Sequence, residues 1–198
     1  MRNPWSTKLY DNSSKSFVPA KIALLTAETA EEYIDKGWWT GLDGEDNEDD
    51  RYWDWSKFIH QHRYGSRSKK YEFRALRTDD HAIQSAIILE TNVQTPNYPP
   101  GVRICNLSSA PWNRFSLAGE NRRYCGCGRQ LVVFACIVTY NLGTQGAIVG
   151  YPLKNSIEFY TRLGFSPTGI FDARLGLELY ELPPDSIEGI LTENGLFA

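Results

Sequence analysis

The most apolar segment of the chain lies in its second half, at residues 131–142, where nearly every side chain is apolar. Such a segment predicts a helix packed between a sheet and other elements, and Gly143 provides its C-terminal stop. The apolar stretch 147–151 predicts a short buried strand. A further helix is predicted at residues 155–163, ending before Gly164.

Strand patterns occupy much of the remaining sequence. Residues 71–76 and 82–89 flank an acidic turn and predict an antiparallel hairpin. Residues 168–171 and 177–182 predict a second, closing hairpin. Three prolines and a glycine make residues 95–101 a loop. The segment that follows this loop, residues 102–110, is expected to be extended and to stop at Pro111.

The N-terminal part of the chain is more polar. Residues 1–20 contain two prolines and an Asp-Asn-Ser-Ser cluster, and they predict an arm or loop. A strand is predicted to begin at residues 21–25, followed by a helix that starts at 26–28. We therefore expect an N-terminal arm over 1–20 and a single domain over 21–198.

This order of elements, antiparallel strands first and a β-α-β-α-β run later, predicts an α/β (α+β) protein with a mixed sheet. A chain of 198 residues with 41% hydrophobic content can bury one substantial core. No apolar run approaches the roughly 20 residues that a bilayer crossing needs. The N-terminus also lacks the apolar stretch of a signal peptide. A soluble, cytoplasmic protein without a membrane partner is expected.

Charge and cysteine content exclude further classes. The formal net charge of −3 and the pI near 5.7 argue against nucleic acid as a partner. The four cysteines are too few for a disulfide scaffold and are expected to be free thiols. Cys125 and Cys127 lack Cys-x-x-Cys spacing, and the three histidines lie well upstream of them. No metal site is expected.

The strongest candidate for chemistry is the stretch 123–131, Arg-Tyr-Cys-Gly-Cys-Gly-Arg-Gln-Leu, which joins a strand pattern to the apolar helix. Gly126 and Gly128 allow the backbone to approach a bound group closely and to direct free N–H groups at it. A helix start of this kind binds anions, phosphate above all. Taken alone, two such glycines more often shape a tight turn, but Arg122, Arg123 and Arg129 concentrate positive charge here.

Two common nucleotide motifs do not fit this stretch. A dinucleotide fingerprint requires a third glycine at position 131, which is Leu131, and an acidic residue about 20 positions later. A Walker-type loop requires Gly-Lys-Ser/Thr after the glycines, which the sequence lacks. A nucleotide-binding enzyme is therefore the weakest of the functional classes considered.

The same stretch resembles the acyl-CoA signature of the GNAT N-acyltransferase superfamily, Arg/Gln-x-x-Gly-x-Gly/Ala, which Arg123, Gly126 and Gly128 match. Residues 155–165, containing Phe-Tyr-x-x-x-Gly-Phe, resemble a later helix of that family. The resemblance covers roughly residues 21–182 and is firmest over 102–165. It implies a GNAT-like mixed, mostly antiparallel twisted sheet, flanked by helices and split between two central strands that hold acyl-CoA.

The resemblance also implies where the co-substrate, acetyl-CoA or another acyl-CoA, is held. Backbone N–H groups of Cys125, Gly126, Cys127, Gly128 and Arg129 would bind its pyrophosphate, with Arg123 adjacent. The backbone of Leu107, Ser108 and Ser109 would form hydrogen bonds with the pantetheine arm and polarise the thioester carbonyl. The residues from 112 to 122 form a longer connection than is usual in the family and would add a wall to the site.

Roles in proton transfer follow from the same resemblance. Tyr160 is the candidate general acid for the departing CoA thiolate, because a tyrosine with an ordinary pKa of about 10 keeps its proton at neutral pH. The alternative for Tyr160 is a packed aromatic side chain. No carboxylate lies in 102–110, where some relatives place a glutamate. Glu90 is therefore the first candidate for a base, followed by Asp54 and His60. A water chain, or an acceptor that arrives already neutral, would need no side-chain base.

The acceptor is expected to be an amine of a small molecule, peptide or protein. Six of the eight residues from Asp43 to Asp50 are acidic, which predicts a solvated surface loop or, alternatively, a region that attracts a cation. Trp53, Asp54 and Trp55 follow and are candidates for acceptor binding, although the two tryptophans would more often anchor a core. A homodimer is compatible with the resemblance. The alternative function is a non-catalytic GNAT-like domain that binds acyl-CoA or a protein.

Overall fold

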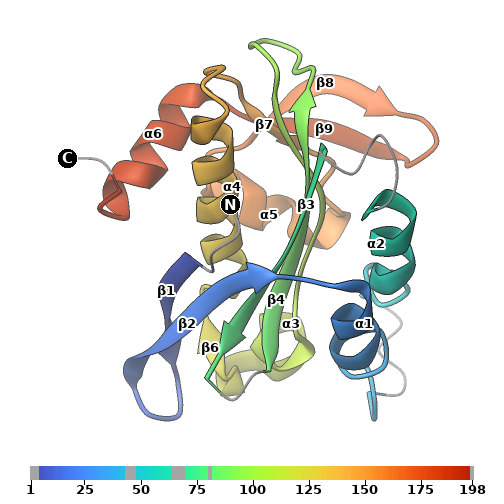
Figure 1. The fold of residues 1–198 in the computed structure, drawn as a ribbon, viewed down its shortest axis with the longest axis vertical. Coiled ribbons are helices and arrows are strands. Elements are labelled where there is room, and N and C mark those ends of the chain that lie inside the picture. The colour runs from blue at the N-terminus through green and yellow to red at the C-terminus, as the bar shows by residue number, and fades with distance from the viewer. Residues whose placement is uncertain (1–4, 43–47, 64–69, 80–81, 197–198) are drawn as a thin grey trace. The chain divides into compact units, whose positions relative to one another are not determined.

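The computed structural model describes residues 5–42, 48–63, 70–79 and 82–196. In this part of the chain, nine strands follow one another across one mixed, mostly antiparallel sheet, in the order β6-β1-β2-β3-β4-β5-β7-β9-β8 (Figure 1). The sheet class expected from the sequence is thus confirmed. The chain divides into two compact units. Unit 1 comprises residues 1–88 and 106–131, and unit 2 comprises residues 89–105 and 132–198.

Unit 1 begins with a β-hairpin. β1 (Trp5–Asp11) pairs antiparallel with β2 (Ser16–Leu24), and β1 also pairs with β6 (Tyr124–Cys125). The expectation of an arm or loop over residues 1–20 is wrong for these strands. Only alternate side chains such as Leu9 are buried in them, so the hairpin carries too little apolar character to stand out in the sequence. The single domain expected over 21–198 stays a prediction.

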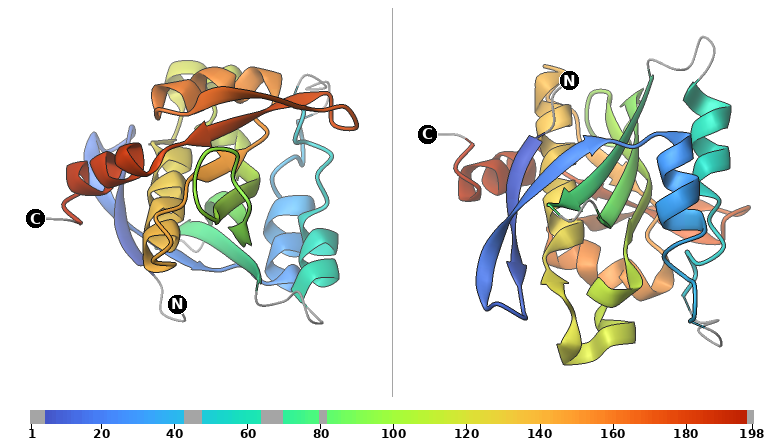
Figure 2. Two further views of the ribbon diagram at one scale, coloured as in Figure 1. Left: turned by 90° about the horizontal axis from the view of Figure 1, so that it is seen from above. Right: turned by 60° about the horizontal axis from the view of Figure 1, so that its bottom comes forward.

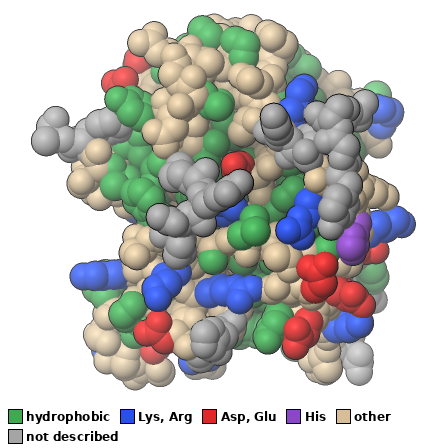
Figure 3. All heavy atoms as spheres, in the orientation of Figure 1, with side chains coloured by type: hydrophobic (Ala, Val, Ile, Leu, Met, Phe, Trp, Pro, Cys, Tyr) green, Lys and Arg blue, Asp and Glu red, His purple; other side chains and the backbone are tan. Residues whose placement is uncertain are grey.

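The first helix starts where the sequence predicts. The hydroxyl of Thr26 accepts a hydrogen bond from the Thr29 N–H at 3.2 Å and so caps α1 (Ala27–Ala30). A π-helical turn (Glu31–Asp35) continues this helix, and α2 (Trp55–Arg63) lies beside α1 in the views of Figures 1 and 2. Figure 3 shows acidic side chains gathered over α1 and the turn that follows it.

The start of α2 is fixed to this turn by a carboxylate. Asp35 accepts hydrogen bonds from the backbone N–H groups of Trp55 and Ser56, each at 3.0 Å. Trp55 is buried, and its ring lies 6.5 Å from the ring of Trp38, which donates its indole N–H to the Ile83 carbonyl. The helices of unit 1 are therefore held together by an aromatic core and by the half-buried carboxylate of Asp35.

The middle strands of unit 1 agree with the predicted strand-turn-strand pattern. β2 pairs antiparallel with β3 (Tyr71–Thr78), and β3 is next to β4 (Ile83–Val93) in the sheet. Asp80 and His81, at the turn, lie outside the described residues. After the strand β5 (Gly101–Ser109), short helical turns cover Pro111–Asn113, Phe115–Ala118 (α3) and Gly119–Asn121.

Unit 2 is built on a parallel strand pair. β5 pairs with β7 (Ile148–Gly150) from Val102 to Ile104, and β7 pairs antiparallel with β9 (Leu177–Leu182). The hairpin of β8 (Ser166–Asp172) and β9 is the predicted closing hairpin.

The two chain segments that lead into β5 and β7 lie so close together that glycine is required at one position in each. A Cβ atom on Gly101 would lie 1.9 Å from the Ala147 carbonyl oxygen, and one on Gly146 would lie 2.3 Å from the Pro100 carbonyl oxygen. Either substitution would push the two segments apart.

Three helices complete the chain. α4 (Cys127–Asn141) begins before the apolar segment itself, α5 (Ile157–Arg162) is the predicted later helix, and α6 (Pro184–Glu193) was not predicted. Among the described residues, no helix combines the length and apolar character that crossing a membrane requires.

Candidate functional site

The glycine stretch of unit 1 forms the sharp strand-to-helix turn that its sequence predicts. β6 ends at Cys125, and Gly126 adopts a φ of +83°, a left-handed conformation that favours glycine. The Gly126 carbonyl then accepts the Gln130 N–H at 3.0 Å, which is the first hydrogen bond of α4. The N–H groups of Cys127, Gly128 and Arg129 therefore belong to the open first turn of a helix, where an anion is stabilised.

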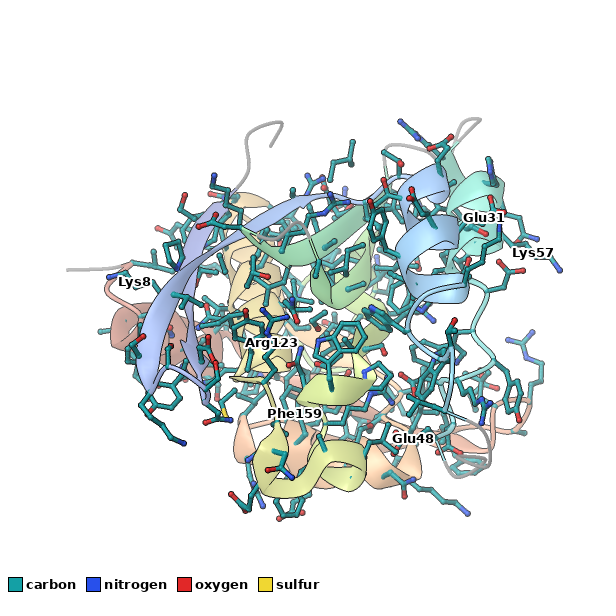
Figure 4. All side chains as sticks on the ribbon, turned by 90° about the horizontal axis from the view of Figure 1, so that it is seen from below. Lys8, Glu31, Glu48, Lys57, Arg123 and Phe159 are labelled. Atoms are coloured by element: carbon teal, nitrogen blue, oxygen red, sulfur yellow. The ribbon has the colours of Figure 1, made fainter. Side chains whose placement is uncertain are left out.

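Basic side chains surround this turn. Arg123 is exposed, and its guanidinium lies 5.0 Å from the centre of the Tyr124 ring. Arg122 donates its Nε–H to the Gly119 carbonyl at 3.2 Å and lies over the Phe115 ring. Glu48, a half-buried acid of the same unit, is well separated from Arg123 in Figure 4. The turn therefore combines a helix start with positive charge.

The N-terminal hairpin holds this turn in place, which the sequence did not predict. The backbone N–H of Asn12 binds the Arg123 carbonyl at 2.9 Å, and its side-chain amide binds the Arg122 carbonyl at 2.6 Å and the Cys125 Sγ at 3.3 Å. Thr7 donates its hydroxyl to the Gln130 side chain at 2.7 Å. Because these contacts span more than a hundred residues of sequence, no local pattern could have revealed them.

The cysteines of the turn are free thiols. Burial raises the pKa of Cys127 to about 12, so its thiol stays protonated at neutral pH. Cys125 is half-buried. No cluster of three potential metal ligands occurs in the part of the chain that the structure describes.

The strand β5 continues beyond its ladder with β7. The ladder with β7 includes Ile104 opposite Gly150, where β7 ends, while β5 continues to Ser109. Two carbonyls in this continuation accept side-chain donors. The Ser108 carbonyl accepts the Ser85 hydroxyl at 2.6 Å, and the Ser109 carbonyl accepts the Arg114 Nε–H at 2.7 Å. Leu107, which precedes these serines in β5, is half-buried.

A buried arginine clamp follows directly in the sequence. Both terminal nitrogens of Arg114 bind the Asp50 carboxylate at 2.7 Å, one also binds Glu48 at 2.7 Å, and the other binds the Ser108 hydroxyl at 2.7 Å. Ser108 donates its hydroxyl to Asp50 at 2.5 Å, and the guanidinium lies over the Trp39 ring at 4.8 Å. All five N–H groups of Arg114 can be satisfied in this arrangement.

This clamp corrects the reading of Asp43–Asp50 as a solvated acidic segment. The side chains of Glu48 and Asp50 are only 14% and 8% exposed, because Arg114 neutralises them in the interior of unit 1. Asp49 is exposed, whereas Asp43, Glu45 and Asp46 lie outside the described residues. The clamp could not be predicted from the sequence, because Asp50 and Arg114 lie 64 residues apart.

The candidate acceptor residues of unit 1 have structural partners. Asp54 is exposed and caps α2, accepting the Lys57 N–H at 2.8 Å. Trp55 is 3% exposed and packs in the core, with the half-buried Trp53 ring 6.0 Å away. His60 is exposed on α2. A role of these residues in acceptor binding stays a prediction, and the burial of Trp55 favours the core role.

In unit 2, Tyr160 is a buried side chain of α5. It is 7% exposed, and its ring packs edge to face with Phe159 at 5.3 Å and with Phe165 at 5.1 Å. Burial raises the pKa of Tyr160 above its ordinary value. The phenol is therefore fully protonated at neutral pH. This protonation state is compatible with a proton donor and equally with a packed aromatic residue.

Glu90, the first candidate for a base, is partnered by a cation. Its carboxylate lies 3.4 Å from Arg103 Nη1, and its side chain is 19% exposed. A nearby thiol, Cys105, has its pKa raised to about 12, first by burial and second by the charge of Glu90. Glu90 is therefore held in an ion pair with Arg103. A role of Glu90 as a base stays a prediction.

No protein-family model matches this sequence, and a comparison with curated proteins found no match. Solved structures do match. The AtaTR complex bound with acetyl-CoA superposes with a TM-score of 0.55 at 21% identity, covering 87% of this chain and 98% of the other. A Tyr-to-Phe mutant of the AtaT toxin, bound to the C-terminus of the antitoxin AtaR and acetyl-CoA, gives 0.55 at 19% identity with the same coverage.

A further bacterial toxin gives a TM-score of 0.53 at 14% identity and covers 100% of this chain and 98% of its own. At such identities the likeness concerns the fold. The GNAT-like fold that the sequence resemblance implies is therefore confirmed.

Proposed function

We propose that this protein is an N-acyltransferase that transfers an acetyl or longer acyl group from acyl-CoA to a primary amine. The observation that carries the proposal is the turn at Gly126, where a left-handed glycine, a helix start and basic side chains coincide. Solved structures with this fold include complexes with acetyl-CoA. The pyrophosphate of CoA is an anion of the kind that such a turn binds.

The proposed chemistry is a direct attack of the amine on the thioester. The acceptor ammonium first loses one proton to water, which leaves a neutral amine. The nitrogen then forms a bond to the acyl carbon and gives up a second proton to water, while the carbon–sulfur bond breaks and CoA leaves as a thiolate that takes up a proton. We assign Tyr160 as the donor of that proton and the backbone of residues 107–109 as the partner of the pantetheine arm and the thioester carbonyl. The arginine clamp supports this assignment because it fixes Ser108 and Ser109.

The first experiment measures acetyl-CoA binding by calorimetry and CoA release with a panel of amines. Gly128→Val should weaken acetyl-CoA binding by at least about 10-fold, because the new side chain blocks the approach of phosphate to the helix start. Gly189→Val is the matched control, since a Cβ on Gly189 of α6 meets no atom within 4 Å.

The result that contradicts the proposal is equally direct. Equal acetyl-CoA affinity of the parent and the folded Gly128→Val variant would remove the turn as the CoA site. Binding without CoA release, over the whole amine panel, would favour the non-catalytic acyl-CoA-binding domain instead.

A further inference from the structure

One face of unit 2 carries a row of side chains across three neighbouring strands. Arg103 of β5 is paired with Val149 of β7, and Val149 is paired with Glu181 of β9. Residues paired across a sheet point to the same face. Glu90 of β4 extends the row, because its carboxylate binds Arg103. The row therefore holds two carboxylates and one guanidinium, on strands that are about 4.8 Å apart.

Two members of this row have a buried atom without a hydrogen-bond partner among the described residues: Arg103 at its Nε, and Glu181. Glu181 is 3% exposed, and its Oε2 accepts a hydrogen bond from the Asn97 side-chain amide at 2.8 Å. Its Oε1 is buried and has no hydrogen-bond partner within the described part of the chain. A buried carboxylate oxygen without a donor is costly, and native proteins supply such atoms with a protein group, a water or a ligand.

Charge decides between these possibilities. Glu90 and Arg103 neutralise one another, whereas the described residues provide Glu181 with the neutral amide of Asn97. The row thus carries one negative charge in excess. A water molecule would satisfy Oε1 but leave this charge unmatched, while an ammonium group would do both.

The surroundings of Glu181 suit the rest of an amine. Leu179 lies on the same side of β9 as Glu181, two residues away, and packs with Val149, Val93 and the half-buried Tyr151. Asn97, which donates a hydrogen bond to the carboxylate, is itself exposed, so the hydrogen-bond partner of Glu181 reaches solvent. The carbon chain of an amine can lie on apolar side chains while its nitrogen reaches the carboxylate.

We propose that Glu181 binds the ammonium group of the acyl acceptor, with its free Oε1 accepting a hydrogen bond from that group. This inference rests on the proposed acyl transfer for its biological meaning, but it concerns a separate binding step. It identifies a carboxylate of β9, rather than the acidic segment before α2, as the group that recognises a cationic acceptor.

The test compares Glu181→Gln with Glu178→Gln. The first change keeps the shape and the Asn97 contact but removes the charge. The second removes the same charge from the same strand, on the opposite side from Leu179 and Glu181. Binding of n-butylamine, 1,4-diaminobutane and spermidine is followed by ligand-detected NMR, and acetyl transfer to the same amines by CoA release. Circular dichroism and acetyl-CoA affinity confirm that the variants are folded.

We expect Glu181→Gln to weaken amine binding, and to raise the KM for the amine, by about 10- to 100-fold, the loss typical of a hydrogen bond to a charged group. Glu178→Gln should stay within a factor of about two of the parent. Unchanged amine binding in Glu181→Gln, or no amine binding by the parent, overturns the proposal. Amine binding that depends on Glu181 without any CoA release would leave the Glu181 site standing and overturn the acyl transfer.

Discussion

The phenol of Tyr160 lies between the rings of Phe159 and Phe165, and its burial raises the pKa above the ordinary value of about 10. In the proposed reaction, Tyr160→Phe should lower kcat by about 10²- to 10⁴-fold, the usual contribution of a general acid, while acetyl-CoA affinity changes little. Stopped-flow and steady-state measurements of CoA release provide the comparison. The loss should persist unchanged up to pH 9, because the phenol does not ionise in that range.

Tyr140→Phe is the control for this prediction, because Tyr140 is 54% exposed on α4. Equal turnover of Tyr160→Phe and Tyr140→Phe at saturating substrates would make Tyr160 a packing residue. A reduced affinity for acetyl-CoA with unchanged kcat would give it a binding role instead.

At the scale of elements, the arginine clamp connects three parts of unit 1: the segment before α2, the end of β5 and the turn before α3. Arg114→Met keeps the length of the side chain but leaves Glu48 and Asp50 buried without a cation. We expect the free energy of unfolding to fall by about 3–5 kcal/mol, as found when one partner of a buried ion pair is removed. Urea denaturation at pH 7.5 gives this quantity.

Two further variants make the clamp prediction specific. Arg174→Met should cost less than about 1 kcal/mol, because Arg174 is 92% exposed in its pair with Asp172. Adding Glu48→Gln and Asp50→Asn to Arg114→Met should restore part of the loss, since the stranded charges are then gone. If Arg114→Met is as mild as Arg174→Met, the acidic segment is solvated after all.

For the whole molecule, buried thiols determine how stability changes at alkaline pH. Burial raises the pKa of Cys136 in α4 to about 12, whereas a thiol in the unfolded chain ionises near pH 8.5. The folded state therefore binds more protons than the unfolded state between these values, so its stability is full below pH 8.5 and falls as the pH rises. One thiol contributes a slope of about 1.4 kcal/mol per pH unit.

This slope can be isolated by comparing the parent protein with Cys136→Ala in urea denaturation at pH 8, 9, 10 and 11. The cavity left by the substitution costs the same at every pH, so the stability difference between the two proteins should shrink as the pH rises. A difference that stays constant from pH 8 to pH 11 would show that Cys136 ionises as freely in the folded protein as in the unfolded one.

Much of the fold could be predicted because the relevant information is local. The apolar run of α4, the strand β7 and the β8–β9 hairpin follow from side-chain periodicity and from glycines at their ends. The glycine turn was predicted for the same reason, since a left-handed backbone at Gly126 is a property of a single residue. The β1–β2 hairpin was missed because its apolar residues are few and spaced among polar ones. Helix α6 could have been predicted, because Ile187, Ile190 and Leu191 have helical spacing after Pro184.

The sequence by itself therefore determined the α/β class, the resemblance to the GNAT superfamily and the glycine-rich turn before α4. Only the tertiary structure decided the state of individual charges. Arg114 neutralises Glu48 and Asp50, Arg103 partners Glu90, and Glu181 is left with one amide. The physical reason is that local conformation depends on neighbours in sequence, whereas the free energy of a charge depends on burial and on partners that the fold brings from distant positions.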